Sequence, residues 1–375
     1  MFYHLLAPLG KTWIIFNLFN YISFRAAGAT VTALLLSFAF GPGIIARLRA
    51  RKIGQVIRAE GPATHQSKRG TPTMGGLIIL FATIVPTLLW APLNNRFVVV
   101  AMLSTLWMGC IGFIDDYLKI VQGKSRGLVA KYKLVGQCTF GVLLGLLLYF
   151  KPVVPVETIP ATATTLPFFK YLVVNFSPLL YVLFVMLVIT GTSNAVNLTD
   201  GLDGLAAGLA GIAAFAFAVF AYLFGRVDVT TYLNLFYLPG AGELTIFCAA
   251  LMGGAIGFLW FNAHPAQVFM GDTGSLAIGG ALGTVAILLK AEFLLLLIGG
   301  VFVAEACSVM LQTGTYKWLR RTRGREYADA HRVFRMAPLH HHFEKLGWAE
   351  TTVVTRFYIL GLLCALVALG TLKVR

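Results

Sequence analysis

Charged residues are scarce in this chain of 375 residues: only 12% are Asp, Glu, Lys or Arg, whereas 58% are hydrophobic. Soluble domains carry roughly 25% charged residues, because their surfaces must meet water. A chain of this length with half that fraction cannot cover the surface of a soluble globule. The composition therefore excludes an ordinary soluble protein and predicts an integral-membrane one.

Cysteine is also scarce, and its few copies are scattered. Each of the five cysteines lies in or beside an apolar segment, and no C-x-x-C pair occurs. Neither a zinc site nor a disulfide framework is indicated, so we interpret the cysteines as small hydrophobic residues. Internal repeats and low-complexity tracts are absent as well. One integral-membrane catalytic domain over residues 1–375 is the simplest division.

The apolar residues come in blocks whose length suits membrane helices. A helix needs about 20 predominantly apolar residues to cross the hydrocarbon. About ten such segments predict an all-α polytopic membrane protein, namely 26–45, 73–90, 97–114, 134–150, 172–189, 205–224, 244–261, 274–289, 293–311 and 353–372. The eighth segment is short, so we expect that helix to be tilted, broken or shielded by its neighbours. Residues 1–20 are rich in aromatic side chains, which predicts an interfacial stretch before the first span.

Lysine and arginine are distributed unevenly between the two sides of this topology. The net charge is +15, and most of the 30 basic residues fall in three connections on one side. Such a bias marks the cytoplasmic side, so both termini are predicted to be periplasmic. The predicted cytoplasmic loops are residues 46–71, 115–133, 190–204, 262–273 and 313–351. Basic loops there favour anionic lipids and phosphate-bearing substrates, so nucleic acid is not needed to explain the charge.

Acidic residues number only 15, and five of them fall at predicted cytoplasmic ends of spans. Asp115 and Asp116 end the third span, Asp200 and Asp203 follow the fifth, and Asp272 precedes the eighth. Hydropathy and basic residues alone define the topology, so the shared face of these acids is independent support for a single site. Magnesium takes one or two carboxylates and fills its other positions with phosphate oxygens and water. The cluster therefore favours a site that handles phosphates.

The same motifs also have structural interpretations. The Asp115–Asp116 pair can simply end a helix at the water interface, although acid has the wrong sign for the helix dipole there. Residues 194–204 can form a glycine-rich turn whose aspartates cap the next helix, and capped helix starts also bind phosphate. On residue patterns alone, both interpretations stay open.

Two further features carry ionisable side chains. His340, His341 and His342 cannot all face one metal on a helix, where neighbours point about 100° apart. One or two of them can donate to phosphate or act as acid–base groups, and a solvated surface is the alternative. Glu305 lies within the ninth span. We expect it to be a protonated or hydrogen-bonded structural group below the acidic cluster, with Gln312 as a candidate partner.

Five motifs occur in order along the chain and together resemble one enzyme family. They are GTPTMGG at 70–76, the pair Asp115-Asp116, NLTDGLDG at 197–204, GDTGS at 271–275 and APLHHHFEK at 337–345. The set is similar to that of bacterial phospho-N-acetylmuramoyl-pentapeptide-transferases (translocase I), in the polyprenyl-phosphate N-acetylhexosamine-1-phosphate transferase superfamily. The likeness covers nearly the whole chain. The PLHHHFEK string separates it from relatives that transfer N-acetylglucosamine phosphate.

The resemblance implies a magnesium-dependent transfer reaction in peptidoglycan synthesis. Undecaprenyl phosphate and UDP-N-acetylmuramoyl-pentapeptide would give lipid I and UMP at the cytoplasmic face of the bacterial inner membrane, and the family suggests a homodimer. One alternative is a sister enzyme that uses UDP-N-acetylglucosamine. A remoter one is a secondary transporter, although transporters place their binding groups near the bilayer midplane and between repeated halves.

The resemblance also implies roles for particular residues. Asp272 would be the principal magnesium ligand, Asp115 would act near the lipid phosphate, and Asp116 would assist. His341 is expected to join these as a catalytic group. The expected substrate-binding residues are Gly201, Leu202, Asn262 and Phe269 around the nucleoside and Asn197, Asp200 and Asp203 at the nucleotide sugar. Phosphates or sugar would be contacted by Lys68, Thr73, Lys119, Lys131, His340 and His341, and His342 is also expected to bind substrate.

Phosphate chemistry constrains the mechanism further. A phosphate monoester has a second pKa of about 6, so most of the lipid phosphate is dianionic at neutral pH. General-base catalysis by Asp115 should therefore matter less than positioning and charge neutralisation. We expect direct attack of the lipid phosphate on the sugar-linked phosphorus. A covalent phospho-enzyme on Asp115 or Asp116 is the competing route.

Overall fold

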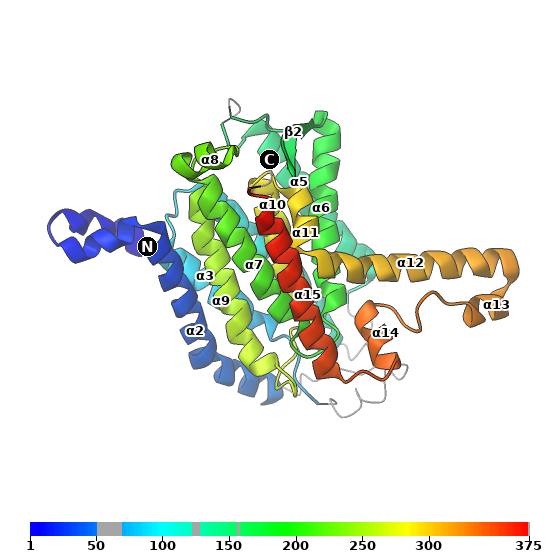
Figure 1. The fold of residues 1–375 in the computed structure, drawn as a ribbon. Coiled ribbons are helices and arrows are strands. Elements are labelled where there is room, and N and C mark those ends of the chain that lie inside the picture. The colour runs from blue at the N-terminus through cyan, green and yellow to red at the C-terminus, as the bar shows by residue number, and fades with distance from the viewer. Residues whose placement is uncertain (51–69, 122–127, 156–157, 374–375) are drawn as a thin grey trace.

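The computed structural model describes residues 1–50, 70–121, 128–155 and 158–373, and most of its long helices lie side by side in one bundle (Figure 1). Its elements are α1 (Phe2–Leu6), η1 (Ala7–Lys11), η2 (Ile14–Asn20), α2 (Ile22–Ala50), α3 (Gly76–Trp90), α4 (Arg96–Val121), α5 (Ala130–Phe150), β1 (Ala163–Leu166), β2 (Phe169–Asn175), α6 (Pro178–Thr199), α7 (Leu205–Phe224), α8 (Val227–Leu233), η4 (Ala241–Glu243), α9 (Leu244–Asn262), α10 (Gly271–Leu288), α11 (Glu292–Ile298), α12 (Gly300–Arg323), α13 (Arg325–Ala330), α14 (Leu339–Lys345) and α15 (Glu350–Gly370).

Helix α10 forms the centre of the bundle. It packs against α4, α6 and α3, and every residue from Thr273 to Leu288 is buried. Glycines allow the neighbouring backbones to approach closely at its first turn. A Cβ at Gly76 would lie 2.1 Å from the backbone nitrogen of Gly274, and one at Gly112 would lie 2.1 Å from the carbonyl oxygen of Asp272. These contacts fix the start of α10 against α3 and α4.

The polytopic membrane architecture is confirmed, with a lower count of full-length spans. Among the described residues, eight helices are long and apolar enough to cross a membrane, and one bent pair can make a ninth. The remaining predicted segment corresponds to α3, whose 15 residues fall short of the usual length. The short eighth segment corresponds to α10, which its neighbours shield as expected.

The ninth predicted span is not one straight helix. α11 and α12 meet at an angle of 88°. Glycines stand at 299 and 300, and such a pair permits a sharp break because neither residue restricts the backbone as a side chain would. Helix α12 therefore leaves the bundle sideways (Figure 1), and it continues to Arg323 rather than ending at residue 311.

The fifth predicted span, 172–189, is wrong at both ends. Residues Phe169–Asn175 form β2, which pairs with β1 in an antiparallel hairpin, and α6 begins only at Pro178. Proline suits the first turn of a helix, where its missing N–H has no partner in any case. The all-α prediction therefore holds for the membrane helices but misses this hairpin.

Several predicted cytoplasmic loops are partly helical. Helix α4 continues to Val121, so Asp115 and Asp116 lie inside its last turns, and α6 continues to Thr199. The predicted loop 313–351 contains the end of α12 together with α13 and α14. Hydropathy marks where apolar residues stop and not where a helix ends, which explains these errors. The predicted substrate residue Lys68 lies outside the described residues.

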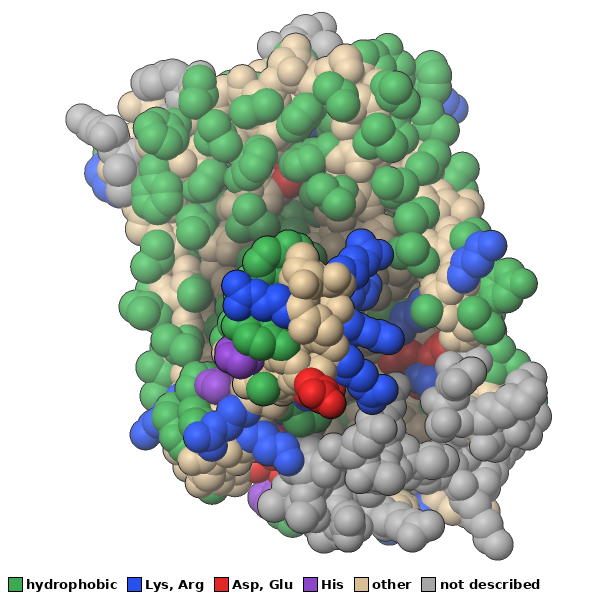
Figure 2. Space-filling view, turned by 90° about the vertical axis from the view of Figure 1, so that its right-hand side faces the viewer, with side chains coloured by type: hydrophobic (Ala, Val, Ile, Leu, Met, Phe, Trp, Pro, Cys, Tyr) green, Lys and Arg blue, Asp and Glu red, His purple; other side chains and the backbone are tan. Residues whose placement is uncertain are grey.

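The outer part of α12 and the start of α13 form an arm that projects from the bundle. Its exposed basic residues are Lys317, Arg320, Arg321, Arg323 and Arg325. Figure 2 shows Lys and Arg side chains on this projection in front of a largely apolar face, and acidic and basic side chains together in a hollow beside it. Apolar surface next to clustered basic residues is typical of the boundary between lipid and water.

Candidate active site

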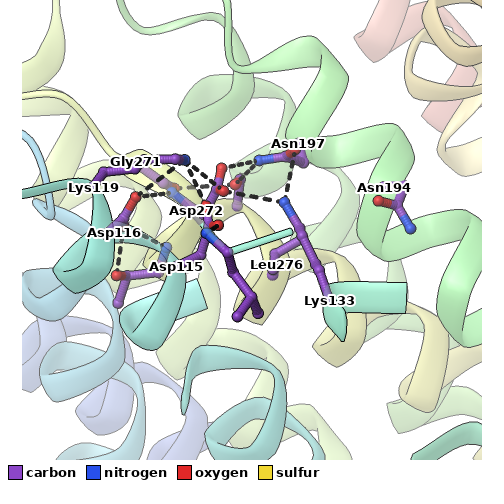
Figure 3. A network of polar contacts seen from close by, with 12 residues as sticks. Asp115, Asp116, Lys119, Lys133, Asn194, Asn197, Gly271, Asp272 and Leu276 are labelled. Atoms are coloured by element: carbon purple, nitrogen blue, oxygen red, sulfur yellow. Dashed lines mark hydrogen bonds and ion pairs between the residues drawn. The ribbon is translucent and has the colours of Figure 1, made fainter. Parts of the chain in front are cut away.

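Three carboxylates from two helices meet at the start of α10 (Figure 3). Asp115 and Asp116 come from α4 and Asp272 from the first turn of α10, and one oxygen of each lies within 4.8 Å of the others. Asp115 and Asp116 are each only 2% exposed. The positive end of the helix dipole favours an acid at the position of Asp272. The structure thus brings together the three aspartates that the sequence assigns to one site.

Two lysines compensate this negative charge. Nζ of Lys119 lies 2.5 Å from Oδ2 of Asp115 and 2.9 Å from Oδ2 of Asp272. Nζ of Lys133 lies 3.1 Å from the same oxygen of Asp272. Without these ammonium groups the buried carboxylates would repel one another strongly. Lys131, the expected phosphate contact, is an exposed residue of α5, whereas Lys133 reaches Asp272.

Asp116 holds the first turn of α10. Its Oδ2 accepts hydrogen bonds from the backbone N–H and the hydroxyl of Thr273 at 2.9 and 2.7 Å. Its Oδ1 accepts the N–H of Asp272 at 3.2 Å. These N–H groups have no partner within their own helix, so Asp116 caps α10 from α4. Gly271 is required beside it, because its φ is +72° and a Cβ there would lie 2.6 Å from Oδ2 of Asp116.

Asn197, in the last turn of α6, orients Asp272 from the other side. Its amide Nδ2 donates to Oδ1 of Asp272 at 2.6 Å and to the hydroxyl of Ser275 at 2.8 Å. Its Oδ1 accepts a hydrogen bond from Lys133 at 3.4 Å. Asn197 was expected at the site; Ser275 was not, although it stands in the GDTGS motif. Asp272 is therefore fixed by groups from α4, α5 and α6.

Asp200 follows α6 directly and adds a fourth acid. Burial and the negative charges of Asp272 and Asp116 raise the pKa of Asp200 well above its usual value, although a hydrogen bond from the backbone of Gly271 opposes this shift. Thr73 approaches the same place, because a Cβ on Gly271 would lie 2.9 Å from its hydroxyl. Both predicted residues therefore border the carboxylate cluster.

Asp203 and Asn262 organise the turn that follows α6. Oδ2 of Asp203 lies 3.1 Å from Nδ1 of His264, and its backbone N–H donates to Glu350 at 2.8 Å. Oδ1 of Asn262 accepts the N–H of Gly204 at 3.0 Å. Asp203, His264 and Glu350 are also close enough together to hold a metal ion. His264 and Glu350 stand outside the five motifs, so no signal in the sequence singled them out.

Other predicted substrate residues contribute through packing and backbone. Leu202 is buried. Phe269 is half-buried, and its backbone pairs with the GTPTMGG motif through Pro72 and Gly75 at 2.8 Å each. Gly201 lies against the ring of His340, since a Cβ there would be 2.2 Å from Nε2. These contacts join the first, third and fifth motifs to the surroundings of α10.

The three histidines take three different environments. His340 is wholly buried and contacts Glu305, which was expected to lie below the acidic cluster and beside Gln312. Nδ1 of His341, the predicted catalytic histidine, lies 2.7 Å from Glu344 on its own helix. Nδ1 of His342 accepts a backbone N–H from the preceding loop at 3.1 Å. A single shared role for the triplet is therefore not supported.

Comparison with known proteins decides the family. Residues 98–290 match glycosyl transferase family 4, and residues 68–80 match phospho-N-acetylmuramoyl-pentapeptide-transferase signature 1. The phospho-N-acetylmuramoyl-pentapeptide-transferase of Gemmatimonas aurantiaca is 59% identical over the full length of both chains. Those of Desulfotalea psychrophila and Endomicrobium trichonymphae are 50% and 49% identical, again over both full lengths. The chain belongs to the phospho-N-acetylmuramoyl-pentapeptide-transferase family.

Family membership confirms the resemblance that the five motifs carry. The chain is a phospho-N-acetylmuramoyl-pentapeptide-transferase and a multi-pass bacterial membrane protein. The matched range 98–290 contains all five aspartates of the predicted site. The APLHHHFEK motif lies beyond that range but inside the full-length alignments.

Proposed function

We propose that this transferase moves phospho-N-acetylmuramoyl-pentapeptide from its UDP donor to undecaprenyl phosphate, forming lipid I and UMP in peptidoglycan synthesis. The observation that carries the proposal is the convergence of Asp115, Asp116 and Asp272 on Lys119 and Lys133, in a chain with full-length identity to the family. Transfer of a phosphoryl group requires its charge to be neutralised and its nucleophile to be held in line. Fixed ammonium groups beside carboxylates suit both needs.

A magnesium ion would bind to Asp272 and Asp115. Their oxygens are the hard ligands that magnesium prefers, together with phosphate oxygens and water. Asp116 is less suited, because three hydrogen bonds tie its two oxygens to the start of α10, whereas Oδ2 of Asp115 binds the ammonium of Lys119, which can turn away. The bound ion would neutralise charge on the diphosphate. Lys119 and Lys133 compensate the carboxylates in the free protein and can turn toward phosphate oxygens when substrate enters.

Asp116 is therefore a positioning residue rather than a third metal ligand. Its hydrogen bonds to Asp272 and Thr273 tie the first turn of α10 to α4. Asn197 restrains the Asp272 carboxylate from α6. Together they hold that carboxylate at the junction of three helices, which gives the geometric precision that phosphoryl transfer demands.

The lipid phosphate attacks the sugar-linked phosphorus directly. One of its oxygens forms the new P–O bond, the bond from that phosphorus to the bridging oxygen breaks, and UMP leaves with the bridging oxygen. The Asp115 carboxylate binds magnesium in this proposal rather than serving a covalent route, and the N–H of Leu128 at 2.7 Å holds its Oδ1. Trapping a labelled phospho-aspartate from the UDP donor alone would refute direct attack.

The remaining site residues receive the donor. Asn197 and Asp200 lie beside Asp272, which supports a place for the sugar phosphate there. Likeness to the family supports a place for the nucleoside at Phe269, Asn262, Gly201 and Leu202. The bias of basic residues supports a cytoplasmic site with both termini periplasmic. The family likeness alone supports a homodimer.

Donor choice tests the proposed function. Purified protein in detergent receives undecaprenyl phosphate, magnesium and either UDP-N-acetylmuramoyl-pentapeptide or UDP-N-acetylglucosamine, and UMP is measured. We expect release with the muramoyl donor alone. Release with UDP-N-acetylglucosamine alone would assign the chain to the sister activity. No release with either donor, from protein shown to be folded, would contradict a transferase of this kind.

A further inference from the structure

Glu305 and His340 form a wholly buried ionisable pair outside the carboxylate cluster. Both residues are 0% exposed. Oε1 of Glu305 accepts the backbone N–H of His340 at 3.2 Å and lies 3.2 Å from Nδ1 of its ring. Among the described residues, Oε2 of Glu305 and both ring nitrogens of His340 have no aligned hydrogen-bond partner. The pair is therefore buried at a cost that its own contacts only partly offset.

Such a pair is a poor device for stability. Replacing a buried ionic pair with apolar residues of similar volume is often neutral or stabilising. Carboxylates inside membrane helices are costly for the same reason and mark functional sites by default. Glu305 and His340 are therefore expected to hold a functional part of the chain in place.

The bend between α11 and α12 brings Glu305 to this position. In a straight ninth span Glu305 would lie well below the acidic cluster. Because the chain turns by 88° before Gly300, the second turn of α12 meets the first turn of α14, where His340 lies. The His340 ring in turn lies against Gly201, where a Cβ would approach Nε2 to 2.2 Å. Glu305 is thus connected through the His340 ring to Gly201, which is part of the NLTDGLDG motif.

We propose that Glu305 is a positioning residue for the UDP donor. Its carboxylate holds the His340 ring against Gly201 and so keeps residues 197–204 in the shape that binds the donor. This inference rests on the proposed function, which assigns that segment to the nucleotide sugar and nucleoside. Undecaprenyl phosphate has no assigned contact with the segment. Loss of Glu305 therefore weakens donor binding and spares acceptor binding.

Two substitutions at Glu305 distinguish positioning of His340 by the carboxylate from simple packing of the side chain. Glu305→Leu keeps an apolar side chain of similar size but removes every acceptor, whereas Glu305→Gln keeps one acceptor oxygen. We expect the leucine variant to raise the KM for UDP-N-acetylmuramoyl-pentapeptide about 10-fold or more, with the KM for undecaprenyl phosphate within about twofold. The glutamine variant should fall between the leucine variant and the wild type. A purely structural role predicts unchanged donor KM in both.

Glu292 supplies a matched control. It is 3% exposed on α11 and accepts a hydrogen bond from Thr164, and its other oxygen has no hydrogen-bond partner in the part of the chain that the structure describes. The 18 residues of α10, about 27 Å of helix, separate it from the start of that helix. Glu292→Gln should leave both KM values within about twofold of the wild type.

A double-mutant cycle identifies the route of action. If Glu305 acts through His340, Glu305→Leu added to His340→Ala should cause no further loss of donor binding. Multiplied losses, or wild-type kinetics of Glu305→Leu, would overturn the inference. If the leucine variant does not fold, Glu305→Gln decides, and an unchanged donor KM contradicts positioning.

Direct binding of the donor, measured by calorimetry on the same proteins, separates this inference from the proposed function. Wild-type protein that binds the muramoyl donor but releases no UMP refutes the proposed function. The ratio of donor dissociation constants between Glu305→Leu and wild type still decides the role of Glu305 in that case. A ratio near one overturns positioning, and a ratio of about 10 or more supports it.

Discussion

Replacing Gly112 with alanine should displace Asp272, the proposed magnesium ligand, without changing its side chain. A Cβ at Gly112 would lie 2.1 Å from the carbonyl oxygen of Asp272 and 2.6 Å from the nitrogen of Thr273, whereas ordinary contacts begin at 3.4 Å. These neighbours are backbone atoms and cannot rotate away. Helices α4 and α10 must therefore separate by roughly 1.3 Å at this level. A misplacement of about 1 Å can cost about 100-fold in rate, and overpacking costs about 1–3 kcal/mol of stability.

The assay is UMP release with both substrates saturating, together with thermal unfolding of the same preparations. Gly191→Ala on α6 is the control, because a Cβ there meets no described atom within 4 Å. Both substitutions gain up to about 1 kcal/mol of helix propensity, so their difference isolates the steric contact. A Gly112→Ala variant with the rate and unfolding midpoint of Gly191→Ala would refute the reasoning.

Three further predictions concern ion binding, stability and pH. Magnesium should raise the unfolding midpoint of the wild type but not of Asp272→Asn, because an ion that binds only the folded state stabilises it; equal shifts in thermal scans would contradict the assignment. Arg25→Met should lower the free energy of unfolding by about 3 kcal/mol, because Arg25 donates two hydrogen bonds of 2.6 and 2.9 Å to Glu243 and its loss leaves that carboxylate unpaired. The double variant Arg25→Met/Glu243→Gln should recover much of this loss, as measured by denaturant titration. The raised pKa of Asp200 means that its charged form costs stability once the pH exceeds the unfolded-state pKa. In EDTA, Asp200→Asn should therefore unfold at a higher temperature than wild type near pH 8. The difference between the two unfolding temperatures should shrink as the pH falls toward about 4, and a constant difference would contradict this explanation.

The membrane helices could be predicted because hydropathy reports burial in lipid directly. The direction of a helix is not encoded there, so the bend at 299–300 and the sideways course of α12 were missed. The hairpin of β1 and β2 was missed for a related reason. Residues 172–174 are apolar enough to pass as the start of a span, and the proline at 178 marks where α6 begins.

Much of the site could be predicted because its acids stand at span ends on one side. The division of labour among them could not. Asp116 caps α10 only because α4 and α10 approach closely in three dimensions, and nothing in the local sequence distinguishes Asp116 from Asp115. Likewise Lys131 and Lys133 stand two residues apart in the first turn of α5, and their different directions around that helix decide that Lys133 reaches Asp272.

Glu305 shows how one error of geometry changes a functional interpretation. A straight ninth span places its carboxylate below the site and favours a structural group beside Gln312. The observed bend moves it onto His340, whose ring lies against the NLTDGLDG motif. In the structure Gln312 instead pairs with the backbone of Phe334. Long-range contacts of this kind have no periodic signal in the sequence.

The most direct test of the account measures UMP and lipid I together from folded wild-type protein, Asp272→Asn and a control aspartate variant. Asp228→Asn is the control, because Asp228 is an exposed residue of α8 paired with Arg226. With the muramoyl donor, undecaprenyl phosphate and magnesium, wild type and Asp228→Asn should form both products in equal amounts. Asp272→Asn should lose about 100-fold or more of that rate while keeping its fold. An Asp272→Asn variant that forms both products at the wild-type rate would contradict the assignment of the active site to this cluster.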